Sequence, residues 1–211
     1  SPRLDDLKII GNSADYHGGG VYCSGSSPTI TDVTLSNNSA IDGGGINASA
    51  SSNINLESST ISGNYAENNG GGIYIENSEA TLIDVIVTDN TANLYGGGGI
   101  EIRNSIATIT GGEITNNTST HYGGGGLLIN DESTVTISNS TIANNEVLAD
   151  NNTGGGIASY GYVTLENVDV INNIASNGSG VRVGTKTFTM TGGSISGNIS
   201  DSGSQEGGAL Q

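Results

Sequence analysis

The sequence predicts an all-β fold, a single-stranded parallel β-helix of about eight coils of roughly 26 residues, with three short strands per coil. Three observations lead to this prediction. A glycine cluster followed by an aliphatic residue recurs along the whole chain, the pattern aliphatic-x-x-Asn recurs between the clusters, and the segments between them alternate apolar and polar residues. Alternation over three to five residues indicates short strands with one buried face. Because one such unit cannot bury its apolar face alone, the repeats predict stacked coils.

The glycine clusters mark where each predicted coil starts. Glycine can take a positive φ and lets a strand approach a turn closely, as a corner repeated in every coil requires. We therefore expect one β-helix domain over residues 1–211. Its coils are predicted to start near residues 18, 43, 70, 97, 124, 154 and 178, after a partial coil at 1–17 and before a partial coil at 207–211.

An asparagine occupies the same place in every predicted coil. Asparagine tolerates left-handed backbone, and its amide can pair with the carbonyl group of an identical side chain in the next coil. We therefore predict a structural ladder rather than a catalytic role. The ladder consists of Asn12, Asn38, Asn64, Asn90, Asn117, Asn145, Asn173 and Asn198. Eight residues before each asparagine lies a predicted core position: Leu4, Ile30, Leu56, Leu82, Ile109, Ile137, Leu165 or Met190.

The composition excludes several classes of function. Five Lys and Arg residues against 21 Asp and Glu residues give a net charge of −16, which is incompatible with electrostatic binding of nucleic acid. Cys23 is the only cysteine, so neither an internal disulfide nor a cysteine-based metal site can form. No apolar stretch is long enough to span a bilayer. We expect no cofactor, no metal, no nucleic-acid partner and no direct membrane span.

The glycine clusters and the aliphatic-x-x-Asn motifs resemble the repeats of the polymorphic outer-membrane proteins, whose autotransporter passengers are right-handed β-helices. The resemblance covers essentially the whole chain. It implies a right-handed coil, an extracellular or cell-surface location and an adhesive role. The chain differs from the family pattern in having mostly Gly rather than Ala at the third cluster position, and Ile, Leu or Val rather than Phe at the start of the asparagine motif.

The candidate ligand-contacting residues lie beside the glycine clusters. Alternation predicts that the second and fourth residues after each cluster point to solvent. We interpret Glu76, Glu101 and Arg103 as a surface ion-pair group, and we expect the rings of the tyrosines that precede two adjacent clusters to stack. The candidates for contact with a glycan are Tyr74, Glu76, Tyr95, Glu101, Arg103 and Tyr122.

These features favour a non-enzymatic extracellular β-solenoid that serves as a structural filament or sheath subunit, a spacer or an adhesin module. Its partner would be a host or cell-surface glycan or protein. Two alternatives remain. A carbohydrate-active β-helix, either a polysaccharide lyase or a glycan-binding protein, would need a groove with converging acids and a base. An ice-binding protein would need a regular threonine array, and the rows that contain Thr29 and Thr31 are interrupted by Asn55 and Glu57.

The first 17 and last five residues contain complementary parts of a repeat. We therefore expect head-to-tail self-association, in which Ala209 and Leu210 complete the coil begun by Leu4 and Ile9 of the next copy. A repeated head-to-tail contact produces an open filament. The rival explanation is that the sequence is a trimmed part of a longer β-helix.

Overall fold

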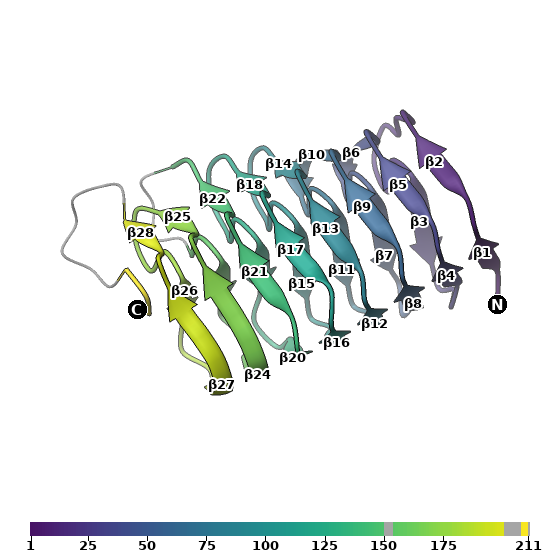
Figure 1. Cartoon of the computed structure of the whole chain (residues 1–211). Coiled ribbons are helices and arrows are strands. Elements are labelled where there is room, and N and C mark those ends of the chain that lie inside the picture. Colours follow the sequence, from purple (N-terminus) through teal and green to yellow (C-terminus); the bar gives the residue numbers. More distant parts are fainter. Residues whose placement is uncertain (150–153, 201–207, 211) are drawn as a thin grey trace.

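The computed structural model describes residues 1–149, 154–200 and 208–210, and its regular elements are all β-strands. The chain winds into a parallel β-helix, with the two termini at opposite ends of the stack (Figure 1). Two of its three sheets contain seven strands each, so the helix has about seven turns where the sequence predicted about eight. Of the partial coil predicted at 207–211, only Gly208, Ala209 and Leu210 are among the described residues.

Sheets B and C each contain one strand from every turn. Sheet B follows the asparagines and consists of β6 (Ser39–Asp42), β10 (Tyr65–Asn69), β14 (Thr91–Ala92), β18 (Thr118–Ser119), β22 (Glu146–Val147), β25 (Ile174–Ala175) and β28 (Ile199–Ser200). Sheet C follows the glycine clusters and consists of β3 (Val21–Ser24), β7 (Ile46–Ser49), β11 (Ile73–Glu76), β15 (Ile100–Arg103), β19 (Leu127–Ile129), β23 (Ile157–Ser159) and β26 (Val181–Val183).

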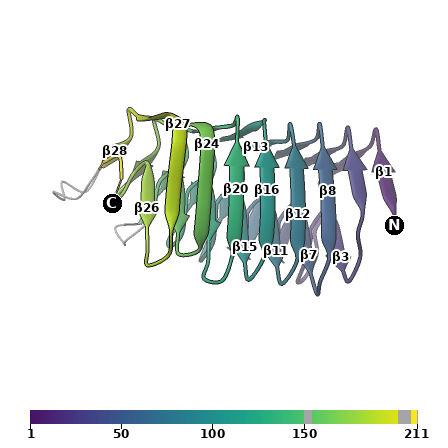
Figure 2. The same ribbon diagram turned by 90° about the horizontal axis from the view of Figure 1, so that it is seen from below.

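Sheet A is bent into two arms. The first arm holds β1 (Arg3–Asp5), β4 (Thr29–Thr31), β8 (Asn53–Glu57), β12 (Glu79–Ile83), β16 (Ile106–Thr110) and β20 (Thr134–Ser138). The second holds β2 (Lys8–Ile10), β5 (Thr34–Ser36), β9 (Thr60–Ser62), β13 (Ile86–Thr88), β17 (Glu113–Thr115) and β21 (Thr141–Ala143). In β24 (Tyr162–Ile171) and β27 (Phe188–Ser196) one strand runs through both arms. Figure 2 shows the first arm continuing into β24 and β27.

The bend in sheet A is a corner that repeats in every turn. Asp32 and Asp84 stand there with φ of 53° and 51°, in the left-handed region that Asn, Asp and Gly tolerate best. The corner divides the contribution of each turn to sheet A into two short strands in most turns. The outer surface of the solenoid consequently has three main faces, one of which is folded.

The interior consists of aliphatic columns in register. Ile30 pairs with Leu56, and Leu56 pairs with Leu82, so that each predicted core position lies directly beside its equivalent in the next turn. These side chains are almost completely buried, which contributes about 1.5–3 kcal/mol for each large aliphatic group. Leu4 and Met190, in the outer turns, are partly buried. The core is thus continuous along the axis.

The eight asparagines form one uninterrupted ladder along the stack. The backbone N–H and the side-chain Nδ2 of Asn64 both donate to Oδ1 of Asn90, each at 2.9 Å, and Nδ2 of Asn64 also donates to the carbonyl oxygen of Leu35 at 3.1 Å. The six asparagines from Asn38 to Asn173 are buried. The left-handed backbone that we expected at the ladder belongs to the preceding residue, for example Asn37 with φ of 55°.

A second ladder, which the sequence analysis did not predict, consists of serines at the corner between sheets C and A. The backbone N–H of Ser52 donates to Oγ of Ser78, and that of Ser78 donates to Oγ of Ser105, both at 3.1 Å. Ser133 continues the row, at 3.4 Å from the N–H of Ser105. All four serines are buried. Two polar ladders therefore satisfy backbone groups at two corners of every central turn.

The middle glycine of each cluster permits close approach of neighbouring turns. A Cβ atom on Gly71 would lie 2.2 Å from the carbonyl oxygen of Gly98 in the next turn, far inside van der Waals contact. The clusters therefore permit the close stacking of the turns in addition to forming corners.

Candidate functional site

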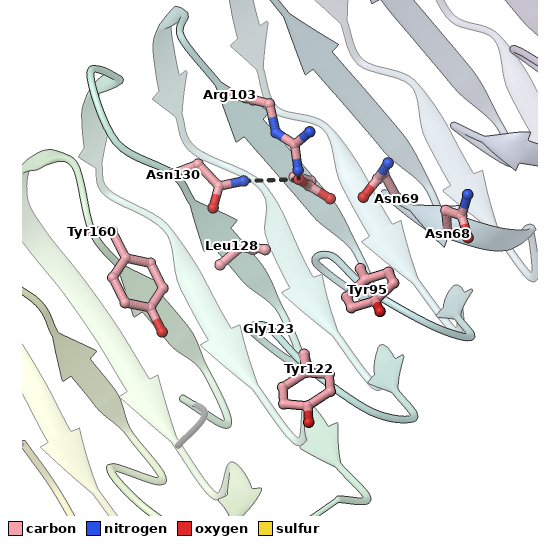
Figure 3. A pocket seen from close by; sticks show the side chains of 10 residues that line it. Asn68, Asn69, Tyr95, Arg103, Tyr122, Gly123, Leu128, Asn130 and Tyr160 are labelled. Atoms are coloured by element: carbon pink, nitrogen blue, oxygen red, sulfur yellow. Dashed lines mark hydrogen bonds and ion pairs between the residues drawn. The ribbon is translucent and has the colours of Figure 1, made fainter. Parts of the chain in front are cut away.

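A hollow of about 370 Å³ opens where sheet C meets the segments that precede the glycine clusters, and we call it the tyrosine hollow (Figure 3). It combines exposed rings, one cation, amide groups and a buried acid. Its lining residues are Asn68, Asn69, Tyr95, Glu101, Arg103, Tyr122, Gly123, Leu128, Asn130 and Tyr160. A second hollow, at the serine corner, is lined by serines, asparagines, Glu79 and Ile106 and contains no ring or cation. The tyrosine hollow therefore offers the more varied chemistry.

Tyr95 and Tyr122 form a stacked pair at the edge of the tyrosine hollow. Their ring centroids are 5.9 Å apart and their planes differ by 14°. They come from equivalent positions in adjacent turns, so the repeat itself sets their spacing. Both remain about half exposed, at 56% and 48%. The pair thus presents apolar ring surface to solvent in the same hollow as Arg103 and Asn130 (Figure 3).

Glu101, the second residue of β15, is the acid of the hollow, and its side chain is fully buried. Its Oε1 accepts a hydrogen bond from Nη2 of Arg103 at 3.1 Å and another from Nδ2 of Asn130 at 2.8 Å. Its Oε2 has no hydrogen-bond partner among the residues that the structure describes. Gly96 closes over this oxygen, and a Cβ on Gly96 would lie 2.3 Å from Oε2. Glycine at this position is what allows the carboxyl group to be covered.

Burial raises the pKa of Glu101 from 4.5 to about 7, although the charge of Arg103 and the hydrogen bond from Asn130 oppose this rise. The charge of Asp42 raises the pKa further. The carboxyl group of Glu101 therefore keeps its proton to a higher pH than an ordinary glutamate does. Tyr74, beside Glu101 in the sheet, has a pKa well above its usual value because it is buried and then because Glu101 is close.

The second residue after each glycine cluster was predicted to point to solvent. This prediction is wrong for four of these residues, which are buried: Tyr74, Glu101, Leu128 and Ala158. They lie on the outer side of sheet C, as the alternation requires, but the chain that enters each glycine cluster folds across them. Gly70 shows this contact, because a Cβ there would lie 2.9 Å from Cα of Tyr74.

The surface ion-pair group predicted for Glu76, Glu101 and Arg103 is also different from the observed arrangement. Arg103 pairs with Glu101, but this partner is buried, whereas the Arg103 side chain is 39% exposed. Glu76 is half-buried and lies beside Arg103 in the register of β11 and β15. Arg103 is therefore flanked by one buried and one half-buried acid.

Sequence reasoning assigned no role to Asn130 or Tyr160, which extend the row of Arg103 along sheet C. Backbone hydrogen bonds from Asn130 to Ile102 and from Tyr160 to Ile129 fix this alignment. The side chain of Arg182 donates to the hydroxyl of Tyr160 and also lies over its ring, 5.2 Å from the centroid. The repeat predicts the positions of Asn130 and Tyr160, because they occupy the place of Arg103 in the next two turns.

The fold also places the acidic side chains and the threonine row of sheet A. In the described ranges, no three His, Cys, Asp or Glu side chains are close enough together to hold a metal ion. The threonine row of sheet A is interrupted in register, since Thr29 pairs with Asn55 and Thr31 with Glu57.

The four residues expected at an axial contact lie in the outermost turns. Leu4 and Ile9 pack against one end of the core, and Leu210 pairs with Val181 at the other end. Leu210 and the neighbouring Ala209 are exposed.

A family model described as a right-handed β-helix region matches residues 19–210. No curated protein and no solved structure matches the chain. The part of the chain that the structure describes contains no helix with the length and apolar character needed to cross a membrane. The family match agrees in handedness with the coil that the outer-membrane resemblance implied.

Proposed function

Since this chain belongs to the right-handed β-helix family, we propose that it is a rigid, non-enzymatic extracellular module that binds glycans through the tyrosine hollow. The observation that carries the proposal is the exposed Tyr95–Tyr122 stack beside Arg103, Asn130 and Glu101. A sugar ring has an apolar C–H face that packs on aromatic rings, and hydroxyl groups that need both donors and acceptors at its edge. The hollow provides both kinds of contact.

The remainder of the molecule suits a spacer that displays this face. The aliphatic core and the asparagine ladder continue from turn to turn, so force or torsion applied at one end is carried by stacked hydrogen bonds. The resemblance to autotransporter passengers supports placement at the cell surface. On this proposal the glycan is the partner and the solenoid holds the tyrosine hollow away from its point of attachment.

The acidic and basic side chains that line the hollow favour binding without cleavage of the glycan. Among the described residues that line the hollow, Glu101 is the only one with a carboxyl group, whereas glycoside hydrolysis uses two. Arg103, the only cation in the described lining, donates to Glu101 and so is not a free base for a lyase reaction.

A carbohydrate-active enzyme is the second candidate, and one observation favours it. A carboxyl group with a pKa near 7 is suited to general acid catalysis at neutral pH. If Glu101 has that role, glycans that bind will be cleaved, and Glu101→Gln will abolish cleavage. Under the binding proposal, reducing or unsaturated ends do not accumulate with either protein.

The binding proposal is tested with a glycan array, followed by titration calorimetry of the glycans that bind. Removing one ring from the stack, as in Tyr95→Ala or Tyr122→Ala, should weaken binding about tenfold, because an aromatic contact contributes about 0.5–1.5 kcal/mol beyond its buried area. Tyr162→Ala is the matched control, since Tyr162 is 42% exposed, close to the value for Tyr122, but lies on sheet A. Failure to bind any glycan, or equal affinity in all three variants, would refute the proposal.

A further inference from the structure

We infer that the tyrosine hollow selects uncharged saccharides and rejects those that carry carboxylate groups, with Glu76, Arg103 and Glu101 as the specificity-determining residues. This inference rests on the proposed function and adds the chemical class of the ligand. Three observations support it: the two acids beside Arg103, the amide oxygens that can accept hydrogen bonds from a ligand, and the negative charge around the hollow.

The positive charge of Arg103 is offset by two neighbouring acids. Its guanidinium donates to Glu101, and the register of β11 and β15 places Glu76 beside it on the other side. Directly paired residues of neighbouring strands interact at their side chains. An anionic ligand that contacts the exposed part of Arg103 would also lie near these two carboxyl groups, and the repulsion between like charges weakens its binding.

The free hydrogen-bonding atoms favour hydroxyl groups. Asn130 uses Nδ2 to donate to Glu101, and Asn69 uses Nδ2 to donate to Oδ1 of Asp42 at 2.8 Å. Their Oδ1 atoms remain as acceptors, and the oxygen of Asn130 points away from the bond to Glu101 (Figure 3). A hydroxyl group can donate to these oxygens and accept from Arg103, whereas a carboxylate can only accept. The free amide oxygens therefore favour a hydroxyl group over a carboxylate at the positions that they contact.

The charge around the hollow acts in the same direction. The charge of Asp42 is close enough to raise the pKa of Glu101, and the chain as a whole carries −16. Charges within about 8 Å are not fully screened at physiological salt. The nearest further cation along sheet C is Arg182, three register steps beyond Glu101, and it is engaged with Tyr160. The local field thus repels acidic saccharides.

The test uses matched probes that differ only in charge. The β-1,4-linked trimers of glucose, mannose and galactose are each titrated beside the counterpart oxidised to the uronic acid at C6, at pH 7.5 and moderate salt. At least one neutral trimer should bind, and its acidic counterpart should bind at least tenfold more weakly. Glu76→Gln should reduce that ratio several-fold, because one of the two acids beside Arg103 is then neutral. Glu57→Gln, which neutralises an exposed acid on sheet A, should leave the ratio unchanged.

The outcomes separate this inference from the proposed function. An acidic trimer that binds as tightly as its neutral counterpart, or a ratio that Glu76→Gln leaves unchanged, would overturn the inference while leaving glycan binding intact. Absence of binding by all trimers, neutral and acidic, would overturn both.

Discussion

Replacing Glu101 by Gln should change the pH dependence of stability by an amount that follows from its burial. The pKa of this carboxyl group is about 7 in the folded protein and 4.5 ordinarily. Each unit of difference corresponds to 1.36 kcal/mol, so the protonated form is favoured in the folded state by about 3 kcal/mol. Because the folded pKa is raised, this stabilisation is fully present below pH 4.5, decreases as the pH rises, and is lost above pH 7.

Glutamine has the shape of the protonated carboxyl group and keeps Oε1 as the acceptor for Arg103 and Asn130. We therefore expect Glu101→Gln to have nearly the stability of the parent at pH 4 and to be more stable by about 3 kcal/mol at pH 8.5. The free energy of unfolding is measured by urea denaturation, followed by circular dichroism, at half-unit pH intervals. Other acids titrate in both proteins, so the difference between the two curves isolates Glu101.

Glu57→Gln is the control, since its exposed carboxyl group should give a difference that stays within about 0.5 kcal/mol at every pH. A flat difference curve for Glu101→Gln would refute the reasoning. So would a parent protein that is the more stable of the two at pH 8.5, because Arg103 would then be holding Glu101 in its charged form.

The remaining predictions concern the scaffold. Asn90→Ala should lower the free energy of unfolding, measured by urea denaturation, by about 1–3 kcal/mol, because it leaves buried ladder groups unsatisfied. Asn55→Ala, on the exposed face, should change it by less than about 0.5 kcal/mol. Equal losses in the two variants would contradict the ladder's role. Gly71→Ala should lower the melting temperature or prevent folding, because its Cβ would meet the Gly98 carbonyl at 2.2 Å, and a parent-like melting temperature would exclude that contact. Burial raises the pKa of the Cys23 thiol, so a thiol reagent at pH 8 should label it only when the protein unfolds, and rapid labelling of native protein would contradict its burial.

The periodic part of the fold could be predicted from the sequence. Leu56 and Leu82 occupy the same place in successive repeats, and stacked repeats put such positions in one column. The serine ladder has an equally regular spacing, so the signal for Ser52 and Ser78 was present in the sequence, although no role was assigned to it. Repetition predicts which residues stack, because the same local geometry recurs in each turn.

The candidate site could be predicted only in part. Alternation tells on which side of a strand Glu101 lies, but not what covers that side, and here the covering segment contains Gly96 from the chain entering the cluster. The stacking of Tyr95 on Tyr122 followed from the repeat, whereas the hydrogen bond between Asn130 and Glu101 depends on rotamers that the pattern does not determine. The burial and the raised pKa of the acid are thus tertiary effects.

A nuclear magnetic resonance titration tests the central claim, that the tyrosine hollow is a saccharide-binding site, most directly. Uniformly ¹⁵N-labelled protein is titrated with the neutral trimer that binds most tightly, and amide shifts are mapped onto the sequence. We predict that the largest shifts come from the amides of Gly96, Arg103, Gly123 and Asn130, which lie in or beside the hollow, and that they disappear in Tyr122→Ala. Shifts confined to sheet A, or shifts of equal size in Tyr122→Ala, would contradict this account.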